Sequence, residues 1–332
     1  MLINAETTIQ RKHATSAFQG KVSQKLDIWN EQILTILAFC EADLDFGTGS
    51  GMDTQITDDI IQTRVKPMVD GLLGEVEKVI YKSETIGRRL NSGVKVCITG
   101  EPNVGKSSLM NLLAEENVAI VTDIAGTTRD VLQIPLEIGG FPVILYDTAG
   151  VREGSEDIIE KIGIEKTKIM VEEADIVVTM FSPENVENIT KHRKQVYVPK
   201  NNEIVVLNKI ETLDSTENGR IGFIAKDFIK ISCSTKTGTD ELTKILTTKI
   251  ASCFEDVSDN SNELILTERR QISHLKEIVR LVDNFYNYMD VDRTIATEQI
   301  RLISNELGFI TGRTHSMDDI LNTIFSNFCI GK

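Results

Sequence analysis

The segment "GEPNVGKS", residues 100–107, is the most informative about the fold, because a strand-like segment precedes it and a helical segment follows it. The preceding "VKVCIT" at 94–99 is rich in β-branched residues, and helical spacing begins near Ser108. Together they match G-x-x-x-x-G-K-[ST] between a strand and a helix, whereas a glycine turn with an incidental lysine would explain only the loop. In such a loop, backbone N–H groups surround phosphates, Lys106 reaches the β- and γ-phosphates, and the Ser107 hydroxyl holds Mg²⁺. The sequence therefore predicts a nucleotide-phosphate site.

Short apolar segments continue along the chain and alternate with polar segments of helical spacing. They are "FPVILYD" at 141–147, "ADIVVTMF" at 174–181, "EIVVLN" at 203–208 and "FIKIS" at 228–232. Strands that alternate with helices indicate a mainly parallel sheet with helices on both faces.

Three further motifs follow predicted strands or lie between them. "DTAG" at 147–150 is placed to supply a carboxylate on the metal side and a glycine that senses the γ-phosphate, and Thr128 of "GTTRD" could complete the Mg²⁺ shell. "NKIE" at 208–211 stands where GTPases carry NKxD, with Glu211 in place of the aspartate that binds the guanine N1 and N2 groups. "SCS" at 232–234 is placed to offer a backbone N–H to guanine O6, and an ordinary polar loop explains it equally well. The motif set predicts a P-loop GTPase with the candidate nucleotide-binding residues Asn103, Val104, Gly105, Lys106, Ser107, Ser108, Asp147, Thr148, Ala149, Gly150, Asn208, Lys209, Glu211, Ser232, Cys233 and Ser234.

Helical patterns lie on both sides of the α/β region. Apolar residues recur every three or four positions over 5–43, which predicts one long amphipathic helix, and again over about 56–86, with a kink at Pro67. Helical spacing resumes after the acidic stretch at 255–263. We therefore predict an α/β P-loop GTPase domain inserted into a discontinuous all-α helical bundle. The predicted parts are the first helical part at 1–92, the G domain at 93–256 and the second helical part at 257–332.

Composition excludes several other classes of protein. The longest apolar run, at 174–181, is far too short to cross a membrane. The five cysteines are scattered singly, without a CxxC pair, which argues against a zinc site or a disulfide framework. A formal net charge of -14 opposes generic binding to nucleic acid. We expect no membrane partner.

The residue that orients the attacking water is not evident from the motifs. Val151 follows "DTAG" where Ras-like enzymes place a glutamine, and valine cannot position a nucleophile. The acidic candidates nearby are Glu153, Glu156, Asp157 and Glu160, and a solvated surface charge is the common fate of such residues. Position alone does not choose among them.

The motifs, the flanking helices and the tail together resemble the MnmE/TrmE family of tRNA-modification GTPases, known in mitochondria as GTP-binding protein 3. The resemblance rests on "AIVTDIAGTTRDV" at 119–131, on "DTAG" followed by "EKIG" at 160–163, and on the terminal "FCIGK" at 328–332. It implies a K⁺-activated GTPase in which Glu160 orients the water. A K⁺ ion would be held by Asn103 and by a loop that includes Thr122, Ile124 and Thr127, although Asn103 could instead bond a switch backbone. The resemblance adds Arg152 to the catalytic candidates, and to the nucleotide site it adds Thr122, Asp123, Ile124, Ala125, Gly126, Thr127 and Thr128.

The tail raises two alternatives of its own. Cys329 is fourth from the end, as in a prenylation box, but Gly331 and Lys332 occupy the last two places of that box and make it a poor match. In the family, Cys329 corresponds to a proposed catalytic thiol and Lys332 to a residue that lines a folate pocket. A buried structural cysteine is the plain alternative.

The resemblance also sets expectations about partners. It implies modification of the wobble uridine of tRNA, of carboxymethylaminomethyl type, with an FAD-containing partner of the GidA/MnmG type, tRNA reached through that complex, and a G-domain homodimer formed on GTP binding. Met1 begins in the helical region, so we expect the family's N-terminal folate-binding domain to be lacking and a tetrahydrofolate derivative to bind only if that domain is supplied. The expected location is the mitochondrial matrix in a eukaryote and the cytoplasm otherwise. The alternatives are a ribosome-assembly GTPase and a truncated GTP-binding scaffold without modification activity.

Overall fold

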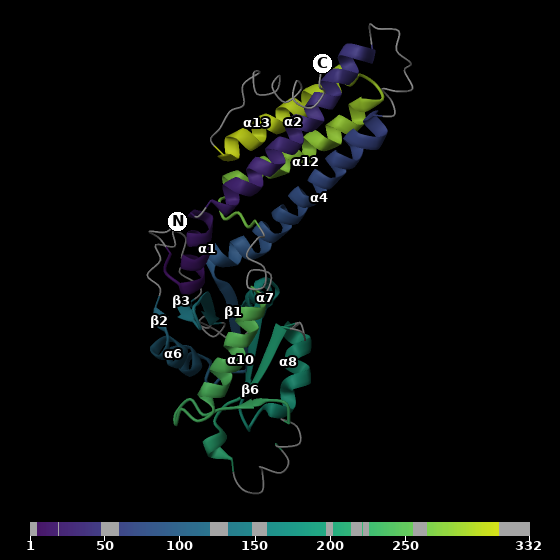
Figure 1. Cartoon of the computed structure of the whole chain (residues 1–332). Helices are drawn as coiled ribbons and strands as arrows, with labels where there is room; N and C mark the ends of the chain where they lie inside the picture. The colour runs from purple at the N-terminus through teal and green to yellow at the C-terminus, as the bar shows by residue number, and fades with distance from the viewer. Residues whose placement is uncertain are drawn as a thin grey trace. The chain divides into compact units, whose positions relative to one another are not determined.

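The computed structural model describes residues 5–18, 20–47, 60–119, 132–147, 158–196, 202–213, 221, 226–254 and 264–311 (Figure 1). The chain forms two compact units. One comprises Met1–Ala14 with Arg89–Asn260, and the other comprises Thr15–Arg88 with Ser261–Lys332. The domain limits at 92/93 and 256/257 stay a prediction.

A seven-stranded sheet with the order β2-β3-β4-β1-β5-β6-β7 organises the first unit. Its strands are β1 Val94–Gly100, β2 Val118–Ala119, β3 Leu132–Ile138, β4 Phe141–Asp147, β5 Ile176–Phe181, β6 Glu203–Leu207 and β7 Ile229–Lys230. β4, β1, β5, β6 and β7 pair in parallel, whereas β2 and β3 are antiparallel to their neighbours. All six residues of β5 are buried, as expected of a parallel strand covered on both faces. The predicted mainly parallel sheet is confirmed, and the antiparallel edge is an addition to it.

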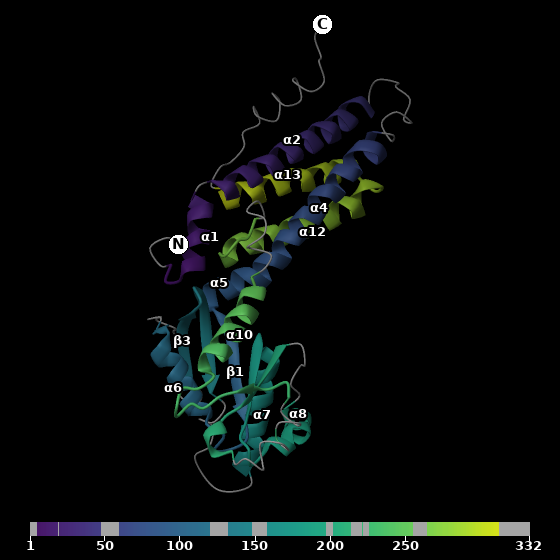
Figure 2. The same ribbon diagram turned by 60° about the horizontal axis from the view of Figure 1, so that its bottom comes forward.

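Helices cover both faces of this sheet (Figure 2). The helical segments described in this unit are α1 Thr8–Phe18 and α5 Arg88–Ser92, which both span the unit boundary, α6 Lys106–Glu116, α7 Ile158–Glu173, η5 Val186–Asn188, α8 Ile189–Val196, η7 Ile210–Thr212 and α10 Thr239–Ser252. α7 packs through Val171 against Cys97 and Val177, which lie side by side on β1 and β5. The carboxyl ends of these parallel strands carry the predicted nucleotide motifs.

The second unit is a bundle built from two distant parts of the chain. Its described segments are α2 Lys21–Gly47, η2 Ile61–Val65, α4 Lys66–Lys82, η3 Ser83–Gly87, α12 Arg269–Met289 and α13 Arg293–Thr311. α12 packs against α4 and α13, and α13 packs against α2, which makes the bundle discontinuous in sequence as predicted. Trp29, Val65 and Phe285 are fully buried in its core. Among the described residues, no helix is both long and apolar enough to cross a membrane.

The long helix predicted over 5–43 is two helices. α1 spans Thr8–Phe18, and α2 begins at Lys21 after Gly20, whose φ of 85° lies in the left-handed region that ends a helix. The start of α1 packs with the sheet unit, because the Ile9 N–H donates to the Gly140 carbonyl (3.1 Å) and the Gln10 side chain donates to the Leu90 carbonyl (2.7 Å). Apolar spacing alone could not reveal this break.

The kink predicted at Pro67 stays a prediction, and the structure shows an irregular helical turn beside it. Pro67 lies in the first turn of α4, which continues directly from helical residues, since Val65 has helical φ and ψ. The π-helical turn η2 ends two residues before Pro67.

Candidate functional site

Two glycines shape the phosphate-binding loop between β1 and α6. Gly100 has φ 149°, and a Cβ there would lie 2.4 Å from the Met180 carbonyl oxygen. Gly105 has φ 97°, and a Cβ there would lie 2.3 Å from the side-chain nitrogen of Asn208. Any other residue would therefore displace a neighbour as well as strain the backbone. Because α6 starts directly after Gly105, its unpaired first N–H groups and helix dipole favour an anion at this point.

The lysine of the motif is held over the loop. Lys106 is 6% exposed, and its Nζ donates to the carbonyl oxygens of Gly100 (3.1 Å) and Glu101 (2.8 Å). These bonds orient the ammonium group along the loop. The position fits the predicted contact with β- and γ-phosphate oxygens.

The two residues predicted on either side of Mg²⁺ meet directly. Ser107 Oγ donates to Asp147 Oδ2 at 2.9 Å, and Asp147, at the end of β4, is 3% exposed. The parallel pairing of β1 with β4 brings Asp147 beside Ile98, two residues before the phosphate-binding loop. A hydroxyl and a carboxylate are hard oxygen donors of the kind that Mg²⁺ prefers, so these residues fit the metal.

Asn208 connects the phosphate-binding loop to the predicted guanine side. Its Nδ2 donates to the Val104 carbonyl (2.9 Å), and its Oδ1 accepts from the Cys233 N–H (3.1 Å). Asn208 is 2% exposed, so both bonds are shielded from water. The sequence predicted that Asn208 belongs to the site, but not that it joins two loops. The Cys233 N–H is committed to this bond, and an O6 donor from "SCS" stays a prediction.

Glu211 is exposed and bonded to the same segment. Its Oε1 accepts a hydrogen bond from Ser234 Oγ at 2.7 Å, and Ser234 Oγ lies 3.0 Å from Ser232 Oγ. Slight burial alone would raise the pKa of Glu211, but hydrogen bonds from the Ser232 and Ser234 hydroxyls bring the pKa below its ordinary value. Glu211 is therefore an ionised acceptor at neutral pH. Lys209, at φ 63°, precedes it in a left-handed conformation.

Burial affects the thiol beside this acceptor. Burial, and then the negative charge of Glu211, raise the pKa of Cys233 to about 11. The Cys233 thiol is therefore protonated and a weak nucleophile at neutral pH.

The remaining predicted residues of the loop differ in their exposure to solvent. Asn103, at φ 62°, and Ser108 are exposed, and Val104 is buried beneath the loop. Glu160 lies in α7, whose backbone is described there, but its side chain lies outside the description. Outside the described residues lie Thr122, Asp123, Ile124, Ala125, Gly126, Thr127, Thr128, Thr148, Ala149, Gly150, Arg152, Cys329 and Lys332.

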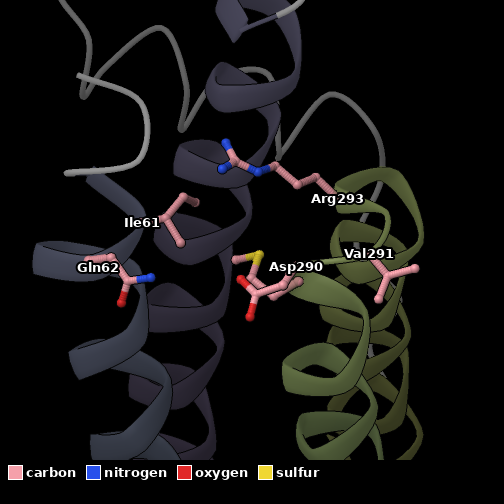
Figure 3. A pocket seen from close by; sticks show the side chains of 6 residues that line it. Ile61, Gln62, Asp290, Val291 and Arg293 are labelled. Carbon is pink, nitrogen blue, oxygen red and sulfur yellow. The ribbon is translucent and has the colours of Figure 1, made fainter. Parts of the chain in front are cut away.

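A separate pocket of about 530 Å³ lies within the helical unit (Figure 3). Its lining comes from η2, from the end of α12, from the turn after it and from the start of α13: Ile61, Gln62, Met289, Asp290, Val291 and Arg293. The Arg293 guanidinium already binds both carboxylate oxygens of Asp43, at 2.9 and 3.0 Å, so its charge is compensated. In the part of the chain that the structure describes, no three His, Cys, Asp or Glu side chains group as a metal site. The pocket carries none of the nucleotide motifs.

Comparison with known proteins assigns the chain to a protein family. The family model described as the MnmE helical domain matches residues 1–329. The chain is 35% identical over 333 residues to the tRNA modification GTPase MnmE of Rickettsia canadensis (strain McKiel), and the match covers 100% of this chain and 71% of that protein. The corresponding protein of Aquifex aeolicus (strain VF5) is 35% identical over 335 residues, with the same coverage. Among solved structures, Aquifex aeolicus Era bound to GDP.AlF4- is 25% identical, with a TM-score of 0.36, over 56% of this chain and 66% of that one. On the family model and the full-length matches, the chain belongs to the MnmE family of tRNA modification GTPases.

Proposed function

We propose that this GTPase hydrolyses GTP with the help of K⁺ and acts, with an FAD-containing partner of the GidA/MnmG type, in modification of the wobble uridine of tRNA. The observation that carries the nucleotide part is the bond network around Asn208. It ties the phosphate-binding loop at Val104 to the predicted guanine-side segment at Cys233, which supports a single nucleotide site that spans both segments. Family membership supports the role in tRNA modification.

GTP would bind with its phosphates over the loop. Lys106 would exchange its two carbonyl bonds for phosphate oxygens, and Ser107 would turn from Asp147 to Mg²⁺, with Thr128 as a further ligand. When bound, Mg²⁺ would neutralise charge on the phosphates. Glu211 would accept hydrogen bonds from the guanine base and Glu160 would orient the water.

Asn103 would supply a side-chain ligand for K⁺. Its exposed amide lies on the loop between Gly100 and Gly105, next to the place of the phosphates, where a cation would offset the charge that develops in the transition state. Thr122, Ile124 and Thr127 would complete that site.

The test compares GTP turnover in KCl and NaCl at equal ionic strength. We expect K⁺ to raise turnover by about 10²–10³, the usual size of one electrostatic contribution of this kind, and Asn103→Ala to remove most of that difference. Asn117→Ala is the matched control, because Asn117 lies at the far end of α6, the helix that follows the loop, and donates to the Leu113 carbonyl. Equal turnover in both salts would overturn the K⁺ proposal and leave the nucleotide site intact.

The tRNA step would use the chain's tail. Cys329 would act as the thiol that takes part in modification with a folate-derived one-carbon unit, and Lys332 would face the folate, which requires a folate-binding domain to be supplied. Cys329→Ser should abolish modification in a complex with the FAD-containing partner, that domain and tRNA, while GTP hydrolysis persists. Full modification by the serine variant, or a lipid on Cys329 found by mass spectrometry, would contradict this role.

Two further expectations concern assembly and place. The G domains would form a homodimer on GTP binding, which sedimentation with a non-hydrolysable GTP analogue would detect. The protein would act in the mitochondrial matrix of a eukaryote or in the cytoplasm of a bacterium.

A further inference from the structure

A buried polar cluster lies under α8 and takes no part in the nucleotide site as described so far. It consists of Thr99, Thr179, His192, Arg193 and Glu203. Thr99 and Thr179 face each other in the β1–β5 register and are 1% and 0% exposed. Two consecutive residues of α8 contact two different strands. His192 is hydrogen-bonded to Thr99 on β1. Arg193 forms an ion pair with Glu203 on β6, and Glu203 also accepts a hydrogen bond from the Thr179 hydroxyl. The cluster therefore has two branches.

The Arg193 branch fixes α8 on the sheet. Arg193 Nη2 lies 2.5 Å from Glu203 Oε2, and Thr179 Oγ1 donates to Glu203 Oε1 at 2.7 Å. The Glu203 side chain is only 2% exposed, so its charge needs both partners. This branch ends within the sheet and leads to no residue of the phosphate-binding loop.

The His192 branch ends at the loop itself. His192 Nε2 lies 3.2 Å from Thr99 Oγ1, and Thr99 directly precedes Gly100. The carbonyl oxygens of the next two residues, Gly100 and Glu101, accept the hydrogen bonds of the Lys106 ammonium group. The imidazole thus anchors the strand end from which the lysine-holding carbonyls project.

The surroundings of His192 keep its imidazole uncharged. Burial lowers the pKa of His192; the negative charges of Glu101 and Glu203 oppose that shift, whereas the positive charge of Lys106 adds to it. The Phe181 ring approaches the imidazole edge-on, with 5.9 Å between ring centroids. A proton on His192 would place a second positive charge near Lys106 under the loop.

We propose that His192 is a positioning residue for GTP hydrolysis, which holds the start of the phosphate-binding loop through Thr99 and thereby places Lys106. The inference rests on the GTPase activity and not on the K⁺, Glu160 or tRNA proposals. It is therefore tested by nucleotide affinity as well as turnover, both at saturating K⁺. If K⁺ does not raise turnover but the His192 variants still weaken nucleotide binding, only the K⁺ proposal is contradicted.

The experiment measures the affinity for a fluorescent GDP and the kcat/KM for GTP in the full chain. We expect Thr99→Val and His192→Leu each to reduce both by about three- to tenfold, the equivalent of one buried hydrogen bond. The double variant should be no worse than either single variant, because each removes the same bond. His192→Gln, which can still bond Thr99, should restore most of the loss.

Thr179→Val is the matched control. It removes a buried threonine hydroxyl at the same register on the neighbouring strand, but from the branch that avoids the loop. We expect it to lower the denaturation midpoint and to leave GDP affinity within about twofold. An equal loss of affinity in Thr179→Val and Thr99→Val, or additive losses at Thr99 and His192, would overturn the proposal.

A pH profile separates positioning from packing. Because the folded-state pKa of His192 is lowered from 6.5, the neutral ring is intact above that pH, and protonation opposes the folded arrangement as pH falls below it. Wild-type GDP affinity should therefore fall more steeply than that of His192→Gln as pH drops through the lowered pKa of His192. Parallel profiles for the two proteins would contradict the role assigned to His192.

Discussion

Asn208→Ala should damage stability and nucleotide binding together. The change removes a donor to the Val104 carbonyl and an acceptor for the Cys233 N–H, both inside the site. A buried polar group left without its partner costs about 1–3 kcal/mol, so two such groups lower the free energy of unfolding by roughly 2–6 kcal/mol. The phosphate-binding loop also loses its tie to the guanine side. We expect GDP affinity to fall at least about tenfold, equivalent to 1.4 kcal/mol, because binding must then order both loops.

Two measurements and one control decide this prediction. Urea denaturation gives the free energy of unfolding, and titration with a fluorescent GDP gives the affinity at a temperature where the variant is folded. Asn117→Ala again serves as the control, since it also removes one asparagine bond to a backbone carbonyl in the same unit. If Asn208→Ala weakens GDP binding no more than Asn117→Ala does, the idea that Asn208 joins the two halves of the site is refuted.

Three other predictions concern single residues of the site. Glu160→Ala should lower turnover with little change in GTP affinity, because the residue would touch only the water, whereas Glu165→Ala, exposed on the same helix, should change neither; a fall in affinity as large as the fall in turnover would make Glu160 structural. Gly105→Ala should weaken GDP binding more than tenfold. The new side chain would strain the left-handed backbone at this position by about 1–2 kcal/mol and would also clash with Asn208. Unchanged GDP binding, measured by calorimetry, would count against this loop geometry. Glu211→Ala should reduce the preference for GTP over ITP, which lacks the 2-amino group. Because the pKa of Glu211 is lowered, the preference of the unaltered protein should stay constant from pH 8 to pH 5 and weaken only as pH drops through that lowered pKa. A preference that declines above pH 5, and that no longer does so in Glu211→Ala, would contradict the assignment.

The chemistry of the loop could be predicted because it is local in sequence. Residues 100–107 contain the glycines, the lysine and the hydroxyl, and the flanking strand and helix appear as β1 and α6. The five parallel strands were also predictable, since each falls on a short, mainly apolar segment bounded by polar residues. β2 and β3 escaped prediction: "VA" is too short for any pattern, and no predicted strand covered "LQIPLEI".

Features that depend on tertiary contact could not be predicted. The break between α1 and α2 follows from Gly20 and from the docking of Ile9 and Gln10 on the sheet unit, which a helical apolar stripe does not encode. The role of His192 was invisible for the same reason. A histidine inside "KHRK" resembles a solvated basic run, yet α8 turns it inward to Thr99.

The phosphate-binding loop therefore depends for its shape on residues far from its motif. Asn208 holds Val104 from 104 positions away, and His192 holds Thr99 from 93 positions away. Asn208 directly follows β6 and His192 lies in α8, so the loop can keep its geometry only while that half of the sheet is folded. A variant that loosens β6 or α8 should then lose nucleotide affinity at temperatures below its unfolding midpoint. Bound nucleotide should in turn raise that midpoint, because it binds only the arrangement that these distant contacts maintain.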